Sequence, residues 1–188
     1  GPINPMVNAI PNILFENKGR VFELNEKSGL MDYGIARGSV HFDFDNDGDQ
    51  DIFVVNQKPT KDVTYYGGVV GSKLYQNESS NDNNWIKIRL RGKQSTTRGL
   101  GARVRVVCSY LNMIREVDGG SSHASQNSSI IHFGLGENKK IDSLIVSWPG
   151  GKKQYLLDIT PNQLIAIEEL FQEEPSFFDS IMNYFDWN

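Results

Sequence analysis

The residues most able to do chemistry are the closely spaced aspartates of the segment DFDNDGDQD, residues 43–51. Carboxylates packed this densely repel one another, so the segment is costly unless a cation lies among them. Calcium fits best because it binds roughly six to eight oxygen ligands in a flexible geometry. Gly48 permits the sharp turn that the loop needs, and Val54 stands where the bidentate glutamate of an EF-hand would be. The segment therefore predicts a calcium site outside an EF-hand, with a solvated acidic turn as the alternative. The predicted side-chain ligands are Asp43, Asp45, Asp47 and Asp51, and Asp49 is predicted to bind through its backbone carbonyl.

Catalytic chemistry is a weaker interpretation. Ser125, His132 and Asp142 are the residue types of a hydrolase triad, but no nucleophile elbow of the G-x-S-x-G type is present. A structural, hydrogen-bonded His132 is the better prediction. Asp43 and Asp45 are poor candidates for a glycosidase acid and base, because a general acid needs a raised pKa and a bound cation lowers it. The sequence thus predicts no catalytic residues and a protein that is not an enzyme.

A second group of polar residues could bind a ligand other than a metal. Arginine can hold carboxylates or backbone carbonyls in a rigid fork, and in a small sandwich such groups usually fix loops and sheet ends. That structural role is the default, and a ligand-binding patch that includes Gly119 and Gly120 is the sharper hypothesis. The candidate ligand-binding residues are Arg115, His123, Gln126, His132 and Asp142.

Composition places the chain among mostly β proteins. Its 188 residues carry a net charge of −4 with the signs interspersed, which gives no reason to expect nucleic acid or an anionic membrane as partner. No apolar run approaches the roughly 18 residues of a membrane span. Cys108 is the single cysteine, so an internal disulfide is excluded, and we expect it to be buried. Trp148 is also expected in the core.

Apolar runs separated by glycine, proline, asparagine and serine predict strands from residue 85 onward. Residues 85–90 alternate with period two, which places Ile86, Ile88 and Leu90 on one face. Further strands are predicted near residues 102–108, 113–117, 130–133, 143–148, 154–157 and 164–167. Their short spacing indicates an antiparallel β-sandwich.

The first region contains an internal echo. Residues 12–17 and 72–77 share the form x-x-Leu-aromatic-x-Asn, and the aspartate segment lies between them. Echoes of this size suggest the blades of a β-propeller. With Gly19, Gly29-Leu30 and the aspartates before an apolar strand, this pattern resembles the FG-GAP/VCBS repeat. The resemblance implies a calcium-binding blade of an extracellular propeller over residues 1–80, with the remainder of the propeller outside this sequence.

The second region, residues 81–170, resembles the ASPIC/UnbV domain along nearly its whole length. The matching motifs are RGLGARV at 98–104, REVDGGS at 115–121, HFGLG at 132–136 and IDSLIVSWPGG at 141–151. That family typically follows FG-GAP/VCBS repeats, which is the order expected here. Residues 171–188 form an acidic, aromatic tail in which Pro175-Ser176 could start a short amphipathic helix that docks on this domain or on a partner.

The predicted fold is mainly β, with one blade followed by a sandwich. The predicted function is non-catalytic adhesion or recognition of a protein or glycan on a cell surface or matrix, by an extracellular protein with structural calcium. One alternative is an enzyme, or an enzyme accessory, acting on polysaccharide or in secondary metabolism. A structural spacer that caps a propeller is another. The functional prediction depends on resemblance and on the absence of catalytic motifs.

Overall fold

A computed structural model describes residues 11–31, 34–57, 71–78, 82–120, 122–123 and 125–170. All of the regular secondary structure in these residues is β-strand, which confirms the prediction of a mainly β protein. The chain divides into two compact units. The first comprises Gly1–Trp85 and Asp118–Ser128, and the second comprises Ile86–Val117 and Ser129–Asn188. The predicted helix of the tail at 171–188 lies outside the described residues.

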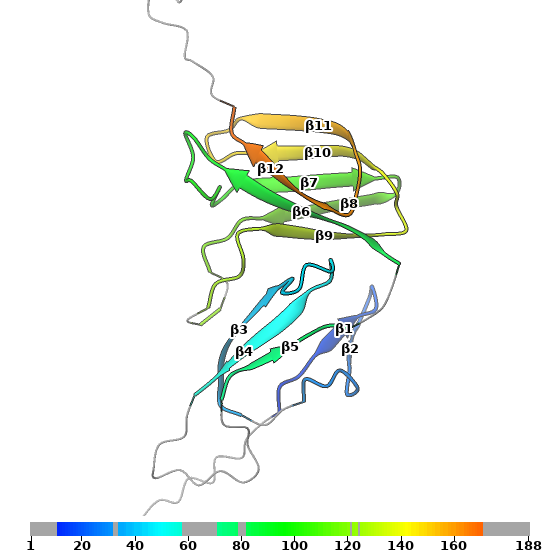
Figure 1. Cartoon of the computed structure of the whole chain (residues 1–188), viewed down its shortest axis with the longest axis vertical. Helices are drawn as coiled ribbons and strands as arrows, with labels where there is room; N and C mark the ends of the chain where they lie inside the picture. Colours follow the sequence, from blue (N-terminus) through cyan, green and yellow to red (C-terminus); the bar gives the residue numbers. More distant parts are fainter. Residues whose placement is uncertain are drawn as a thin grey trace, which may run out of the picture. The chain divides into compact units, whose positions relative to one another are not determined.

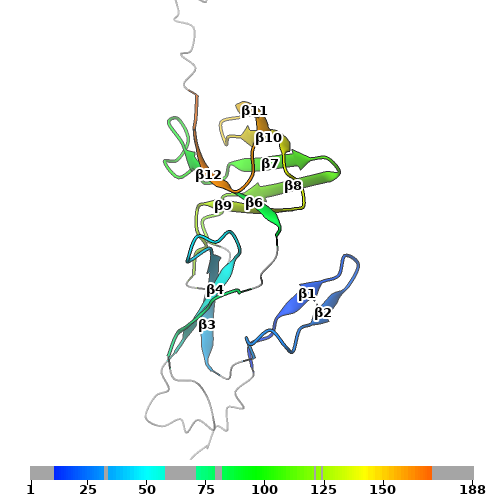
Figure 2. The same ribbon diagram turned by 45° about the vertical axis from the view of Figure 1, so that its right-hand side comes forward.

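The first unit contains a short hairpin and a three-stranded antiparallel sheet. Strands β1 (Phe15–Asn17) and β2 (Phe22–Leu24) form the hairpin. The sheet has the order β3-β4-β5, from β3 (Ala36–Phe42), β4 (Asp51–Asn56) and β5 (Lys73–Tyr75). Figure 2 shows the hairpin and the sheet as separate ribbons. Leu30 and Val54 are the buried hydrophobic residues among the described positions of this unit, so little of its apolar surface is covered.

The second unit consists of two sheets that share one core (Figure 1). The four-stranded sheet is antiparallel, with the order β11-β10-β7-β8. Its strands are β7 (Arg103–Cys108), β8 (Leu111–Glu116), β10 (Ile141–Ser147) and β11 (Lys153–Ile159). The other sheet has the order β12-β6-β9, from β6 (Asn84–Arg91), β9 (Ile131–Gly136) and β12 (Gln163–Glu168). This arrangement is consistent with the predicted β-sandwich.

One strand pair departs from the antiparallel prediction, because β12 runs parallel to β6, with Gln163 opposite Ile86 and Glu168 opposite Arg91. A parallel pair needs a long crossover rather than a hairpin. The chain between β6 and β12 provides that crossover, and it contains all four strands of the other sheet and β9.

The core follows the predicted alternation. Ile86 and Ile88 are fully buried and Leu90 is nearly so, all on the same side of β6. Alternate residues of β7 and β10, together with Phe133 and Leu135 of β9, belong to the same cluster. Burial of large aliphatic and aromatic side chains contributes about 1.5–3 kcal/mol each to folding. Cys108 and Trp148 are also buried, as predicted.

Candidate metal centre

The aspartate loop connects β3 to β4 of the first unit. Antiparallel pairing of these strands continues to Phe42 opposite Asp51, so the loop begins and ends at the same edge of the sheet. This closure brings the carboxylates of Asp43, Asp45 and Asp51 together, with one oxygen atom of each within 4.8 Å of the others. Asp51 is fully buried and Asp45 is exposed. Three of the predicted ligands therefore converge on one point of the loop.

Asp51 accepts hydrogen bonds from the start of the loop and from the residues that follow β5. Its Oδ2 accepts a hydrogen bond from the Phe44 backbone N–H at 2.6 Å, and its Oδ1 accepts one from the Asn77 N–H at 2.8 Å. Asn77 follows β5, so a single carboxylate joins the loop to the third strand of the sheet. Gln76 contributes a second link, because its Nε2 donates to Asp45 Oδ2 at 2.7 Å. Gln76 and Asn77, the last two residues of the repeated pattern at 72–77, thus orient Asp45 and Asp51.

The remaining aspartates shape the turn. The Gly48 N–H donates to Asp43 Oδ2 at 3.1 Å, and the Asp47 N–H donates to Asp45 Oδ1 at 3.3 Å. Asp47 in turn accepts from the Asp49 N–H at 2.9 Å. Such side-chain-to-backbone bonds are typical of Asx turns. Of the five predicted ligands, the carboxylates of Asp47 and Asp49 lie outside the group of three.

The electrostatics of the loop are unfavourable for Asp49. Burial, followed by the negative charges of Asp47, Asp51, Asp45 and Asp43, raises the pKa of its carboxyl to about 6. Its Oδ1 is buried and has no hydrogen-bond donor among the described residues. A divalent cation would stabilise the ionised forms of all five groups. The donors are oxygen atoms of carboxylates, which is the ligand chemistry that calcium and magnesium prefer.

Trp85 contacts the loop in a way that sequence reasoning missed. Gly48 has a φ of +101°, and a Cβ atom built on it would lie 1.8 Å from Trp85 Nε1. The glycine is therefore required both by the left-handed backbone and by the indole packed against it. The sequence assigned Trp85 to the first strand of the second region, and nothing in the local pattern pairs it with Gly48.

The predicted ligand-binding residues divide between the two units. His123 and Gln126 belong to the first unit, whereas Arg115, His132 and Asp142 belong to the second. His123 and Gln126 are exposed, and His132 is half-buried on β9.

Contacts within the second unit are defined for Asp142 and Arg115. Asp142 Oδ2 accepts a hydrogen bond at 2.7 Å from the N–H of Ser109, which has a positive φ in the turn between β7 and β8. The Arg115 guanidinium lies over the Phe133 ring, 5.7 Å from its centroid, and donates to the Ile114 carbonyl. Through these contacts Asp142 holds the turn between β7 and β8 and Arg115 packs on β9, and a ligand-binding role for either residue stays a prediction.

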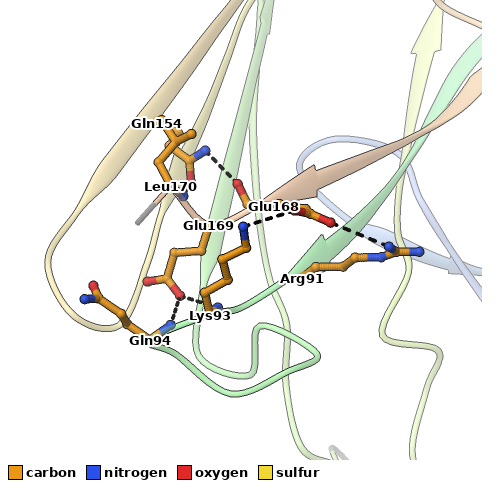
Figure 3. A network of polar contacts seen from close by, with 7 residues as sticks. All are labelled: Arg91, Lys93, Gln94, Gln154, Glu168, Glu169 and Leu170. Carbon is orange, nitrogen blue, oxygen red and sulfur yellow. Dashed lines mark hydrogen bonds and ion pairs between the residues drawn. The ribbon is translucent and has the colours of Figure 1, made fainter. Parts of the chain in front are cut away.

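Glu169 is a second polar residue that the sequence did not single out. Its side chain is almost fully buried, and its Oε2 accepts the backbone N–H groups of Lys93, Gln94 and Ser95 at 2.9, 2.9 and 2.7 Å. Figure 3 shows Glu169 with Lys93 and Gln94. Its Oε1 accepts a hydrogen bond from the Ser95 hydroxyl at 3.0 Å. Burial raises the pKa of Glu169, but the bonds from Ser95, Lys93 and Gln94 outweigh burial and lower the pKa overall. Successive backbone N–H groups of this kind form an anion-binding nest, here filled by the protein's own carboxylate.

Comparison with known proteins assigns a family to residues 92–174. Residues 92–174 match the family described as ASPIC and UnbV, so this part of the chain is an ASPIC/UnbV domain. The match confirms the resemblance drawn from the four motifs between residues 98 and 151.

The curated relatives are longer proteins. Over 135 residues the chain is 31% identical to cartilage acidic protein 1 of Homo sapiens, and 30% identical to the proteins of that name from Mus musculus and Xenopus tropicalis. Each match covers 69% of this chain but 18% of the human protein and 19% of the other two. The chain therefore spans about a fifth of the length of the curated relatives it matches.

Proposed function

We propose that this chain is part of an extracellular, non-catalytic recognition protein in which a calcium ion orders residues 43–51. The observation that carries the proposal is the convergence of Asp43, Asp45 and Asp51, each with one oxygen within 4.8 Å of the others. Calcium would neutralise these carboxylates and would fix the connection between β3 and β4. The backbone carbonyl of Asp49 and the carboxylate of Asp47 would complete the ligand set.

Calcium is preferred to magnesium because of the form of the loop. Magnesium demands near-ideal octahedral geometry and keeps several waters, whereas calcium accepts more protein oxygens at variable angles. Five aspartates in nine residues offer many oxygens without a rigid geometry. Carboxylate loops of this kind outside cells bind calcium with dissociation constants of about 0.1–1 mM, a range suited to extracellular calcium.

The first unit is proposed to be an FG-GAP/VCBS blade of a larger propeller. Apolar side chains of its hairpin are exposed, with Phe15 57% and Phe22 69% accessible, and Ile13 and Leu24 also exposed. A repeat of this kind buries its apolar faces by stacking against neighbouring repeats. The exposed hairpin is what a blade would present to the rest of the propeller.

The names of the relatives and the chemistry of the aspartate loop support the proposed extracellular location. The relatives are named for cartilage, and the aspartate loop suits a calcium-rich environment. No helix long and apolar enough to cross a membrane occurs among the residues that the structure describes. A protein or glycan on a cell surface or in a matrix is the proposed partner.

A structural role for Arg115 and Asp142 supports a non-catalytic protein. Asp142 accepts a hydrogen bond from the Ser109 N–H, and the Arg115 guanidinium packs over the Phe133 ring. Both side chains therefore make contacts within the second unit. The enzyme alternative needs these groups to converge on a substrate with perturbed pKa values.

A thermal melt of the chain in millimolar calcium and in EDTA tests the calcium site. A ligand that binds only the folded state at a hundred times its Kd stabilises that state by about 2.7 kcal/mol. For a chain of this size, calcium should therefore raise Tm by roughly 5–10 °C. Asp45→Asn should abolish the increase in Tm, because the substitution removes one negative charge from the three converging carboxylates. Asp45 is exposed, so the substitution leaves the packing of the unit intact.

The matched control is Asp82→Asn, which makes the same charge change at an exposed residue outside the loop and should keep the full response. Hydrogen exchange localises the effect: calcium should slow exchange of the β3 and β4 amides and leave β10 unchanged, because the loop joins β3 to β4. An unchanged Tm, or an equal increase in Asp45→Asn, would show that the loop binds no calcium.

A further inference from the structure

The outer face of the four-stranded sheet in the second unit carries exposed apolar side chains. Alternate residues of a strand point to opposite faces, and Val104, Val106, Leu144 and Val146 are buried in the core. Their neighbours therefore point outward. The strand register aligns these outward residues in rows across all four strands, the first being Tyr155, Ile145, Arg105 and Ile114. The second row is Leu157, Ser143, Val107 and Asn112.

Several of these side chains are well exposed. Tyr155 is 63%, Leu157 is 68% and Ile114 is 56% accessible. Tyr155 and Leu157 are neighbours on the outer face of β11, and Ile114 lies on β8 in the same row as Tyr155. Single exposed apolar residues are ordinary, but a group of them on one sheet face marks an interaction surface. A sheet in a small domain commonly covers such a face with a helix or a second layer.

The same face is basic. A third row consists of Lys153, Ser147, Arg103 and Glu116. Arg103 is paired with Glu116 at 2.7 Å, and Arg105 donates to the amide oxygen of Asn112 at 2.8 Å. Three cationic side chains and one carboxylate thus lie in the three rows, which favours an acidic, apolar occupant.

We propose that the occupant is the segment 171–188 of this chain. It contains Glu173, Glu174, Asp179 and Asp186 and no lysine, arginine or histidine. It also places Phe178, Ile181, Met182 and Phe185 at the spacing i, i+3, i+4 and i+7, which is the apolar stripe of an amphipathic helix. Its charge and its apolar stripe both complement the sheet face.

The segment starts at the correct edge of the sheet. Gln154 of β11 accepts a hydrogen bond from the Leu170 N–H at 3.3 Å and donates one to the Glu168 carbonyl at 2.9 Å. Figure 3 shows Gln154 beside Glu168 and Leu170. Because β11 is an edge strand, Leu170, the residue before the segment, lies next to the strand that carries Tyr155 and Leu157. Four strands span about 15 Å, and a helix over residues 176–187 would be about 18 Å long, so one helix can cross the face.

Hydrogen exchange of the full chain, read by mass spectrometry on peptides from 171–188, tests the inference. In the unchanged chain we expect the amides of 176–187 to be protected. In the double variant Tyr155→Thr with Leu157→Thr, amides of the segment should exchange about tenfold faster or more. The variant removes two apolar side chains that docking of the segment would bury, while keeping residues that favour strands. The test does not depend on calcium, so its failure is distinguishable from failure of the metal site.

The control is Leu164→Thr, an exposed leucine of β12 on the other sheet, which should leave protection of the segment unchanged. Arg105→Glu should also speed exchange of the segment, because it turns an attraction into a repulsion. Absence of protection in the unchanged chain would overturn the inference. So would protection that is insensitive to Tyr155 and Leu157, or that rises with protein concentration, since the latter indicates a second copy as the occupant.

Discussion

At the scale of single residues, the shape of the aspartate loop depends on the hydrogen bonds that each aspartate side chain accepts. Asp51 is buried with a donor on each of its oxygens, so it has a fixed orientation. Asp45 and Asp47 each accept the N–H of the residue two positions ahead, which curls the loop, and one oxygen of Asp45 lies in the converging group. Gly48, with a φ of +101°, supplies the left-handed backbone that the turn requires.

Gly48→Ala should destabilise the first unit by about 2–3 kcal/mol. Strain at a positive φ costs about 1–2 kcal/mol for a residue with a Cβ, and the Cβ must also displace the Trp85 indole. Thermal unfolding of the first unit, followed by hydrogen exchange of β3 and β4, measures the loss. Gly19→Ala is the matched control, because Gly19 has a φ of +88° and nothing within 4 Å of its Cβ. Equal losses in both variants would show that Trp85 does not constrain Gly48.

At the scale of strands and loops, Glu169 joins two segments that are distant in sequence. It follows β12, and its carboxylate holds the loop of Lys93, Gln94 and Ser95 that follows β6. The two strands are parallel neighbours, so both loops begin at the same end of the sheet. Glu168, the preceding residue, instead reaches Arg91 and Lys93 on the surface at 3.6 and 3.4 Å. Exposed ion pairs of that kind contribute about 0–1 kcal/mol.

Glu169→Gln should lower the free energy of unfolding by about 2 kcal/mol at pH 7, because hydrogen bonds to a buried charged group are worth about 1.5–3 kcal/mol. Glu168→Gln should change it by less than about 1 kcal/mol. Denaturant unfolding of the two variants and the unchanged chain measures both values.

The effect should also depend on pH. The pKa of Glu169 is lowered in the folded state, so the folded protein favours the ionised form. Its stabilisation is complete above the ordinary glutamate pKa of about 4.3 and is lost as pH falls through the lower pKa of the folded state. The difference between Glu169→Gln and the unchanged chain should therefore shrink below about pH 4. A difference that stays constant down to pH 3 would contradict this account.

At the scale of the whole molecule, the two units have different sources of stability. The second unit has a closed hydrophobic core from both of its sheets. The first contributes Leu30 and Val54 to the buried hydrophobic residues among its described positions, and it carries the aspartate loop. We infer that the first unit depends on calcium and on further blades, whereas the second depends on burial.

Recognition should therefore require calcium if the first unit takes part in it. The chain, immobilised and tested on glycan and matrix-protein arrays, should bind in millimolar calcium and lose binding in EDTA. Asp45→Asn should lose binding, and Asp82→Asn should retain it. Binding by a longer protein with further blades, but not by this chain, would instead assign the chain a spacer role.

Local patterns in the sequence were sufficient for the strands and much of the core. Period-two alternation places Ile86, Ile88 and Leu90 inside, and the motifs from 98 to 151 identify the ASPIC/UnbV domain. The aspartate spacing likewise predicts a loop whose carboxylates converge, as three of them do. These features depend on residues that are close in sequence, so a single sequence contains the information.

Contacts between distant residues were decided by the tertiary structure alone. The parallel pairing of β12 with β6, the Trp85 indole against Gly48, and the capture of Glu169 by residues 93–95 each join segments that local patterns treat separately. Sequence by itself determined which residues are apolar, acidic or able to turn, and the packed chain determined which of them meet.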